Sequence, residues 1–506
     1  MDAKTPTRKE ALLKPALTKV KAARVRVHLP LVGITVRQAI PGTVQLLQAG
    51  TQAVQLEVVV TAVGKEVINM DSHVVKNVLE GSSILPRPPV LDGPNKAPVV
   101  RLQDGLVLDE RIFQQPVLLL GAVGSGKTYL LDRIMEPVLQ EADKVADNVV
   151  IFCAKDDFLK YRRPGDPLIA VDSSEPGSCW NIFRELSQSS NPELTARDIS
   201  KSLFSDRKSS IQPFFSNAGS HILFSVLMDM YEDSIKKGTM YSNLHLVDFM
   251  NNTTIRGNGD YPSWRELASL RPKYFGHIND YLGDDLELGQ GYGVISELTT
   301  LIHDCFWGSF ASEGSFSAIE ALKTGKRIFL YYDHATCSEA SIKIFSTIIS
   351  LLLKHSVSRA NGGRRTWFFI DEASLLPKVN WIDAMSLGRQ LGFRLCFSLQ
   401  SASLMRRHYS EDEAMSLLSL FPNIISLRVD DSMSRQVIQD RYGEMLCSYS
   451  FSSIGQKIAQ HVQERKVVAD FDFSTLLQRK GDAICSIPNL SPTAPFLYKG
   501  FKEDLT

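Results

Sequence analysis

Residues 117–130 read VLLLGAVGSGKTYL, an apolar run that enters a glycine-rich stretch ending in Lys-Thr. The spacing Gly121-x-x-x-x-Gly126-Lys127-Thr128 is the pattern of the phosphate-binding loop of nucleoside triphosphatases. Glycines let successive backbone N–H groups turn towards one anion, and the N-terminus of the following helix adds partial positive charge. The stretch therefore predicts a site for a nucleoside triphosphate.

We expect the whole loop to bind ATP, and its members are Gly121, Ala122, Val123, Gly124, Ser125, Gly126, Lys127 and Thr128. Within it, Lys127 reaches the terminal phosphates and the Thr128 hydroxyl ligates Mg²⁺. A chain of this length shows the pattern by chance on the order of one or two times in a hundred. The apolar run before it and the helical spacing over Tyr129–Val138 make a chance match rarer still.

A second motif supplies acidic groups. The apolar run Trp367–Ile370 ends in Asp371 and Glu372. At the C-terminal edge of a parallel sheet, Asp371 would orient Mg²⁺ through water and Glu372 would polarise the attacking water as general base. A buried strand that ends in a solvated acidic turn is the alternative, and the loop at Gly121–Thr128 favours the catalytic interpretation.

A polar residue also ends the run LCFSL, where Gln400 precedes Ser401. Gln400 is predicted to contact the γ-phosphate or the water and to sense the state of the nucleotide. A capped strand end explains the same residues equally well.

The last third of the chain is rich in arginine, at positions Arg389, Arg394, Arg406, Arg407, Arg428, Arg435 and Arg441. If the protein forms a ring, one of them could project into the neighbouring site and stabilise the charge of the transition state. Arg389 is the first candidate. For any single arginine, an ordinary surface or ion-paired role is the alternative.

Short apolar runs alternate with helical patterns from about residue 99 onward. The strand candidates are Pro116–Leu120, Asn148–Ala154, Leu168–Asp172, Arg327–Asp333, Trp367–Asp371, Arg394–Ser401, Ile424–Val429 and Ala483–Ile487. Continuous apolar runs are typical of parallel strands covered by helices on both faces. The pattern predicts an α/β fold with a doubly wound, mostly parallel sheet.

Apolar spacing near 3.6 over Phe214–Tyr231 and Ile295–Phe306 indicates helices between the two nucleotide motifs. We therefore expect an inserted all-α domain at 190–320, and a motor domain formed by 99–190 and 320–500. No chemistry is assigned to the segment CWNIF at 179–183, which we interpret as an aromatic anchor between these two parts.

The N-terminal region 1–95 is expected to be β-rich or partly disordered, with strand candidates at Val25–Val36, Thr43–Gln48 and Val54–Val63. Ser82–Pro98 reads as a linker. Basic residues crowd the first 26 positions: Lys4, Arg8, Lys9, Lys14, Lys19, Lys21, Arg24 and Arg26. A solvated tail and a contact surface for nucleic acid, acidic lipid or a partner both fit this tail.

Composition bounds the class and compartment. The 506 residues are 44% hydrophobic and 22% charged with a formal net charge of zero, as in a soluble protein of two or three domains. No run reaches the roughly 18–20 apolar residues that cross a bilayer, and no signal peptide is evident. Seven cysteines without a C-x-x-C pair fit a reducing compartment. We expect a cytoplasmic protein, either free or peripheral at the inner face of the membrane.

Together these residues resemble the conjugative coupling ATPases of type IV secretion systems, the TraG/TraD group, within the FtsK/HerA superfamily. The matching stretches are LLLGAVGSGKT, VVIFCAKDDF, Asp172 with CWNIF, GSFSAIEALKTGKRIFLYYD, FFIDEASLL, LGRQLGFRLCFSLQS and VVADFDFSTLLQRKGDAICSI. The likeness covers roughly residues 100–500, and the order of the motifs is its most specific feature.

The resemblance implies a RecA-like motor with an inserted all-α domain, a homo-hexameric ring, and ATP-driven handling of DNA or of a protein–DNA substrate. It carries ATP and Mg²⁺ to Gly121–Thr128, hydrolysis to Asp371 and Glu372, and the strand-end glutamine to Gln400. Many coupling proteins begin with membrane-spanning helices, which this sequence lacks. Two expectations follow: a soluble variant that a membrane partner recruits through residues 1–95, or a cytosolic DNA translocase.

Three functions remain open at this point. The first is an ATP-hydrolysing DNA translocase that acts as a secretion coupling protein, or as a soluble DNA pump of the HerA/FtsK kind. The second is an ATP-switched receptor that binds a relaxase or effector protein through 190–320. The third is a metabolic kinase, for which no small-molecule pocket motif is seen.

Overall fold

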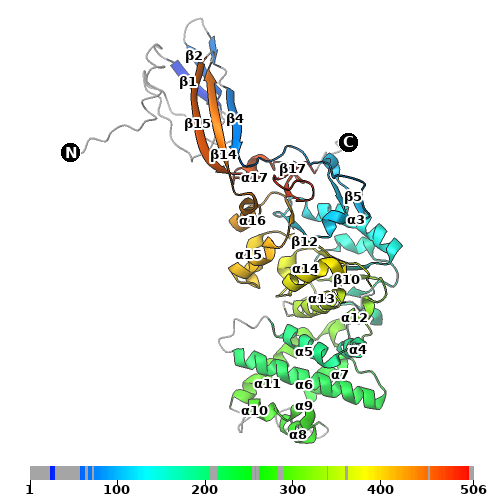
Figure 1. The fold of residues 1–506 in the computed structure, drawn as a ribbon. Helices are drawn as coiled ribbons and strands as arrows, with labels where there is room; N and C mark the ends of the chain where they lie inside the picture. Colours follow the sequence, from blue (N-terminus) through cyan, green and yellow to red (C-terminus); the bar gives the residue numbers. More distant parts are fainter. Residues whose placement is uncertain are drawn as a thin grey trace, which may run out of the picture. The chain divides into compact units, whose positions relative to one another are not determined.

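The computed structural model describes residues 23–28, 57–62, 67–70, 73–205, 213–253, 257, 261–282, 289–338, 340–358, 363–453 and 456–500. The chain divides into two compact units, which are described separately (Figure 1). Unit 1 comprises Met1–Ser83 and Tyr442–Phe471, and unit 2 comprises Ile84–Arg441 and Asp472–Thr506. Among the described helices, none combines the length and the apolar character that crossing a bilayer requires.

Unit 2 is built around a nine-stranded sheet of order β17-β16-β13-β7-β12-β11-β8-β10-β9. Its strands are β7 Val117–Leu120, β8 Asn148–Cys153, β9 Leu168–Ile169, β10 Arg327–Tyr331, β11 Thr366–Ile370, β12 Phe393–Leu399, β13 Asn423–Ser426, β16 Ala483–Ser486 and β17 Phe496–Tyr498. The seven strands from β13 to β9 pair in parallel, and β16 and β17 add an antiparallel edge. The predicted α/β fold with a mostly parallel sheet is confirmed, and all eight predicted strands of this part are present.

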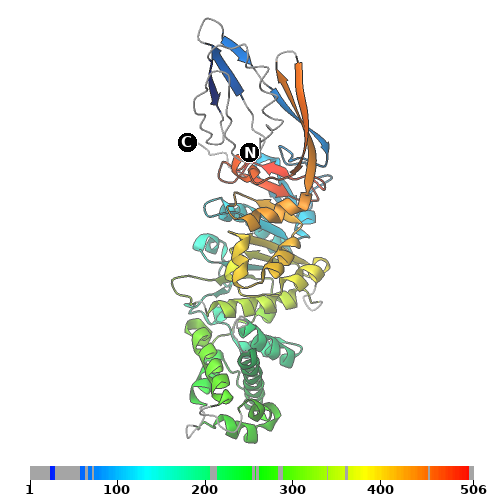
Figure 2. The same ribbon diagram turned by 90° about the vertical axis from the view of Figure 1, so that its left-hand side faces the viewer.

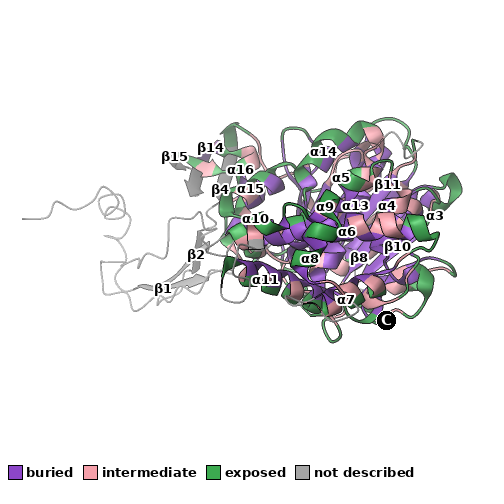
Figure 3. Ribbon diagram, turned by 90° about the horizontal axis from the view of Figure 1, so that it is seen from below, coloured by how far each residue is buried: buried purple, intermediate pink, exposed green. Residues whose placement is uncertain are grey.

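Helices cover both faces of this sheet. The core cluster joins Ile134 of α3 to Ile151 of β8, whereas the neighbouring Phe152 places its ring 6.2 Å from Phe345 of α13, on the opposite face. Both faces of the strands are therefore buried (Figure 3). The helices are α2 Glu110–Phe113, α3 Lys127–Val145, α13 Ile342–Ser356, α14 Trp381–Gly388, α15 Glu411–Ser419, α16 Ser432–Tyr442 and α17 Asp472–Thr475, with a small hairpin of β5 Val99–Arg101 and β6 Val107–Asp109.

A group of helices is inserted between β9 and β10 and lies at one end of unit 2 (Figures 1 and 2). Its members are α4 Ile182–Gln188, α5 Pro192–Leu203, α6 Pro213–Lys237, α7 Asn243–Asn252, α8 Trp264–Leu270, α9 Pro272–Phe275, α10 Ile278–Leu282, α11 Gln290–Cys305 and α12 Ala318–Ala321. The apolar periodicity that predicted helices over Phe214–Tyr231 and Ile295–Phe306 corresponds to α6 and α11.

The two chain crossings into the inserted helices are joined by a buried carboxylate. Glu185 of α4 is fully buried and accepts hydrogen bonds from Trp180 Nε1 at 2.9 Å, Ser317 Oγ at 2.6 Å and the Ile319 N–H at 3.1 Å. Because a buried carboxylate is costly unless it is hydrogen-bonded, this set of donors holds the crossings together. The segment CWNIF thus contributes a polar junction as well as the expected aromatic anchor.

Unit 1 contains two three-stranded antiparallel sheets. The first consists of β1 Ala23–His28, β2 Glu57–Ala62 and β3 Val67–Met70, and the second consists of β4 His73–Glu80, β14 Glu444–Ser453 and β15 Gln456–Lys466. The expected β-rich character of the N-terminal region is confirmed. Most of the basic tail and the strand candidate at Thr43–Gln48 lie outside the described residues.

The position of the hairpin β14–β15 differs from the prediction, which placed all of residues 320–500 in the motor domain. In the structure β14 pairs with β4, and residues 442–471 group with the N-terminal region in unit 1. Both hairpin strands are rich in polar residues and form no continuous apolar run that would predict a strand.

Candidate active site

The glycine-rich loop connects the fully buried strand β7 to helix α3. Gly124 and Gly126 have φ angles of 74° and 106°, in the left-handed region that residues with a Cβ rarely adopt. At Gly121, a Cβ atom would lie 2.5 Å from Ser125 Oγ and 3.0 Å from Leu427 Cβ. The glycines of the motif are therefore required both by backbone conformation and by close packing.

Backbone hydrogen bonds to three other segments hold this loop. The Gly121 N–H donates to Leu399 O at 3.1 Å, and the Ala122 N–H donates to Arg428 O at 2.8 Å. The Gly481 N–H in turn donates to Ser125 O at 2.9 Å. The loop is thus preorganised by the strands beside it rather than by its own sequence alone.

The loop forms one wall of a cavity of about 390 Å³. The same cavity is lined by Asp371, Glu372 and Gln400, so the acidic pair after β11 and the polar end of β12 meet the loop after β7. Its full lining is Val123, Gly124, Gly126, Lys127, Thr128, Tyr129, Ala154, Lys155, His334, Asp371, Glu372, Ser374, Leu375, Gln400, Leu404, Arg407 and Lys480. Ligands of open parallel sheets bind at this carboxyl edge of the strands.

Lys127 is 8% exposed and lies against its own loop. Its Nζ donates to the carbonyl of Gly121 and, at 3.3 Å, to that of Ala122. Burial lowers the pKa of Lys127, and the nearby Glu372 and Asp371 carboxylates oppose this effect. The ammonium therefore lies in the field of the acidic pair and has little contact with water, as a group that binds terminal phosphates requires.

Asp371 is 6% exposed, and burial together with the Glu372 carboxylate raises its pKa to about 6, against the attraction of Lys127. Its backbone N–H is fixed by Phe152 O at 2.9 Å. The strand ladder thus holds in place a carboxylate whose charge has little stabilisation. A divalent cation would supply that stabilisation, because it favours the ionised form.

Replacing Asp371 by Asn should stabilise the nucleotide-free protein at high pH. With a raised folded pKa, the folded protein binds more protons than the unfolded chain, so the wild type becomes more stable as pH falls through about 6. We expect Asp371→Asn to raise the free energy of unfolding by about 2 kcal/mol near pH 8, and the gain to shrink towards about pH 4. Urea unfolding across this pH range measures it; a gain independent of pH would contradict the raised pKa.

Glu372 has an unusual backbone for a residue with a side chain, since its φ of 60° lies in the left-handed region. Such conformations cluster at functional sites, where the surrounding structure imposes them. Its carboxylate accepts a hydrogen bond from Ser374 Oγ. The turn therefore aims the second carboxylate into the cavity instead of continuing the strand.

The other two predicted residues lie in different places. Gln400 follows β12 directly and lines the cavity. Arg389 follows α14, is exposed, and is absent from the lining of this cavity. Arg389 is therefore no part of the site of its own subunit.

Three cavity residues with basic side chains, Lys155, His334 and Lys480, are assigned no role by the sequence motifs. Lys155 and His334 follow β8 and β10, so the rule that ligands gather at the carboxyl edge of parallel strands would have indicated them. Arg407, one of the arginines of the last third of the chain, also lines the cavity. Four cations, Lys127, Lys155, Arg407 and Lys480, line the cavity together with the two carboxylates, and this excess of positive charge suits an anionic ligand.

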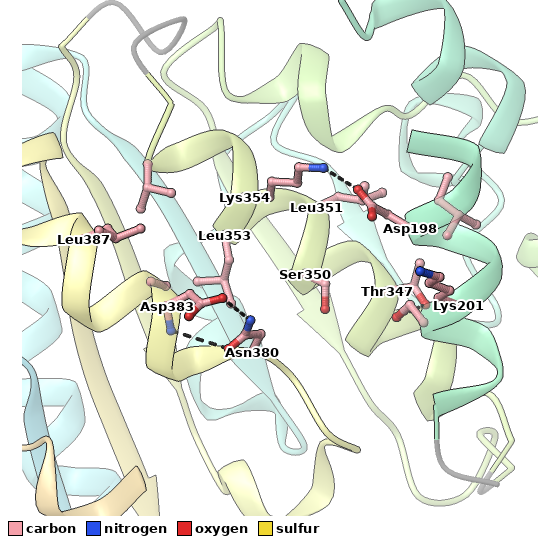
Figure 4. A pocket seen from close by; sticks show the side chains of 14 residues that line it. Asp198, Lys201, Thr347, Ser350, Leu351, Leu353, Lys354, Asn380, Asp383 and Leu387 are labelled. Atoms are coloured by element: carbon pink, nitrogen blue, oxygen red, sulfur yellow. Dashed lines mark hydrogen bonds and ion pairs between the residues drawn. The ribbon is translucent and has the colours of Figure 1, made fainter. Parts of the chain in front are cut away.

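A second cavity of about 420 Å³ lies between α5, α13 and α14 (Figure 4). Lys354 and Asp198 form an ion pair at one side of it, and Asn380 and Asp383 are joined by hydrogen bonds at another. Leu351, Leu353 and Leu387 are among its apolar lining. No glycine-rich loop contributes to this cavity, so only the first one has the features of a phosphate site.

A family model described as the type IV secretion-system coupling protein DNA-binding domain matches residues 103–279 and 294–479, more than half of the chain. A search of curated proteins finds no match.

Solved structures of a bacterial conjugative coupling protein, TrwBdeltaN70, are similar to this chain. The trigonal form in complex with sulphate has 19% identity and a TM-score of 0.64, and covers 84% of this chain and 94% of its own. Plasmid coupling protein TrwB with the ATP analogue ADPNP has 19% identity and a TM-score of 0.61, and the match covers 84% of this chain and 94% of that one. TrwB with ADP and Mg²⁺ has 18% identity and a TM-score of 0.62, and the match covers 85% of this chain and 98% of that one. At these identities the likeness shows the fold.

Proposed function

The chain belongs to the family of type IV secretion-system coupling proteins, and from this membership and the geometry of its cavity we propose that it is an ATP-hydrolysing motor that moves DNA or a protein–DNA substrate. The observation that carries the proposal is the meeting of the glycine-rich loop with Asp371 and Glu372 in one cavity. A triphosphate and a metal ion need both a cationic cradle and acidic groups on the side of the attacking water.

Each residue then has a defined task. The backbone of Gly121–Thr128 would hold the phosphates and Lys127 would neutralise their charge, while the Thr128 hydroxyl and, through water, Asp371 would hold Mg²⁺. Glu372 accepts the proton of the attacking water, and Gln400 contacts the terminal phosphate or that water. The relatives solved with ADPNP and with ADP and Mg²⁺ support nucleotide and magnesium as the ligands.

We further propose that the protein works as a homo-hexameric ring at the cytoplasmic face of the membrane. Arg389, exposed after α14, would enter the site of the neighbouring subunit. The motor comprises the sheet at 99–190 and 320–500 except for the β14–β15 hairpin, and the helices at 190–320 recognise the cargo, such as a relaxase or effector protein. Residues 1–95 are assigned to a membrane partner.

The rate of ATP hydrolysis with and without DNA tests this function. We expect the wild-type rate to rise severalfold with single- or double-stranded DNA, because a DNA motor hydrolyses ATP faster when DNA is bound. Lys127→Ala should be inactive in every mixture and serves as the control for contaminating ATPases. If neither kind of DNA changes the rate of ATP hydrolysis and the protein binds a relaxase, the result would instead support an ATP-switched receptor.

A further inference from the structure

A turn near the C-terminus adds a cation to the nucleotide cavity. Residues 476–482 connect α17 to the antiparallel strand β16, and Lys480, in the turn Arg479–Asp482 at the end of this connection, lines the cavity. The matched family region ends at residue 479. Lys480 is therefore a cavity residue to which neither the sequence motifs nor the family match assigns a role.

This turn is attached to the phosphate-binding loop itself. The Gly481 N–H donates to Ser125 O at 2.9 Å, and the Asp482 N–H donates back to Arg479 O at 3.2 Å. Gly481 has a φ of 86°, the left-handed conformation that glycine adopts without strain. Backbone hydrogen bonds thus fix the position of the turn, and with it the backbone of Lys480, next to the loop.

The C-terminal segment holds the turn from its other side. Lys499 Nζ donates to Asp482 Oδ2 at 3.0 Å and to Leu476 O at 2.9 Å. A Cβ atom at Gly500 would lie 2.1 Å from Gly481 O and 2.8 Å from its carbonyl carbon. A side chain at position 500 would therefore displace the turn, because two backbone segments are in contact there.

We propose that Lys480 binds the phosphates of the nucleotide, and that Gly500 is a positioning residue that sets its place. This inference rests on the proposed function, since it names a further contact to the same ligand. Its physical basis is the addition of a further ammonium group to a cavity already lined by Lys127, Lys155 and Arg407. An ammonium next to a phosphate forms a charge-assisted hydrogen bond that a neutral side chain cannot replace.

The first test compares Lys480→Ala with Arg479→Ala. Both variants remove one exposed cation from the same turn, but only Lys480 lines the cavity. Titration of each full-length protein with ADPNP and Mg²⁺ should show a Kd raised about threefold to tenfold for Lys480→Ala and less than about twofold for Arg479→Ala. Equal Kd values for the two variants would overturn the proposal.

The second test asks whether Gly500 acts through Lys480. Gly500→Ala should raise the Kd for ADPNP by about as much as Lys480→Ala, but have little further effect in the Lys480→Ala background, because coupled residues are not additive. Gly177→Ala is the matched control, since a Cβ there meets nothing within 4 Å. Full additivity would contradict the positioning role, and thermal melting separates it from loss of folding.

The outcomes also separate this inference from the proposed function. If the wild type binds ADPNP, Lys127→Ala does not, and Lys480→Ala binds like Arg479→Ala, the nucleotide site stands and the role of Lys480 is wrong. If the wild type itself binds no ADPNP with Mg²⁺, the proposed function fails and the assignment of Lys480 fails with it.

Discussion

Glu372→Gln should bind ATP normally and hydrolyse it on the order of 10³-fold more slowly than the wild type. Glutamine keeps the size of the side chain and an oxygen that can accept the hydrogen bond from Ser374 Oγ, but it cannot accept the proton of the attacking water. The left-handed backbone at position 372 is imposed by the turn and is equally compatible with either residue. Single-turnover hydrolysis and nucleotide titration measure the two properties separately.

A carboxylate far from the cavity provides the control. Glu193 in α5 is exposed and forms an ion pair with Arg197, so Glu193→Gln removes the same charge without touching the site. Its turnover should match that of the wild type. A Glu372→Gln variant that retains wild-type turnover would show that another group accepts the proton, and the assignment of Glu372 as general base would be wrong.

Arg389→Ala should lower turnover on the order of 10³-fold while leaving nucleotide affinity unchanged, if the guanidinium stabilises the transition state in a neighbouring subunit. The residue is exposed and lines no part of the cavity of its own chain, so it cannot act there. A loss of turnover with intact binding is therefore expected only in the assembled ring. Hydrolysis rates measured at several protein concentrations test this dependence on assembly.

Mixed rings decide whether the arginine acts between subunits. Lys127→Ala lacks the phosphate-binding lysine but keeps Arg389, and Arg389→Ala has the reverse defect. In a 1:1 mixture of these two variants about a quarter of the sites combine an intact cavity with an intact neighbouring arginine, because each ring interface joins different surfaces of two subunits. Recovery of activity on mixing supports the role in the neighbour, and two variants that stay inactive together refute it.

The strands of unit 2 could be predicted because most of them are continuous apolar runs. All six residues of β8 and all five of β11 are buried, so each strand appears as a continuous apolar run. The apolar periodicity of α6 and α11 similarly indicated the inserted helices. Local composition was sufficient wherever an element is buried on every side or packs along one regular face.

Local composition does not predict the hairpin β14–β15. Its strands carry many polar residues, and β14 pairs with β4 from the opposite end of the chain. Such pairing depends on which distant segment offers a free strand edge, which no local window of sequence contains. For the same reason the predicted motor domain included residues that group with unit 1.

The candidate site divides in a similar way. The loop and the acidic pair could be predicted from their motifs and their order along the chain, and Gln400 from its place at a strand end. Lys480 carries no comparable signal, because it precedes an antiparallel strand and its turn is placed at the cavity by contacts between distant segments, such as that of Gly481 with Ser125. Its location depends on packing between segments that are far apart in sequence.

A structure of the chain bound to ADPNP and Mg²⁺ tests the central claim most directly. We expect the triphosphate along Gly121–Thr128, with Mg²⁺ about 2.0–2.1 Å from the Thr128 hydroxyl and Asp371 beside it through water. Nucleotide bound elsewhere, for example in the cavity between α5, α13 and α14, or a metal ion with neither Thr128 nor Asp371 as a neighbour, would contradict it.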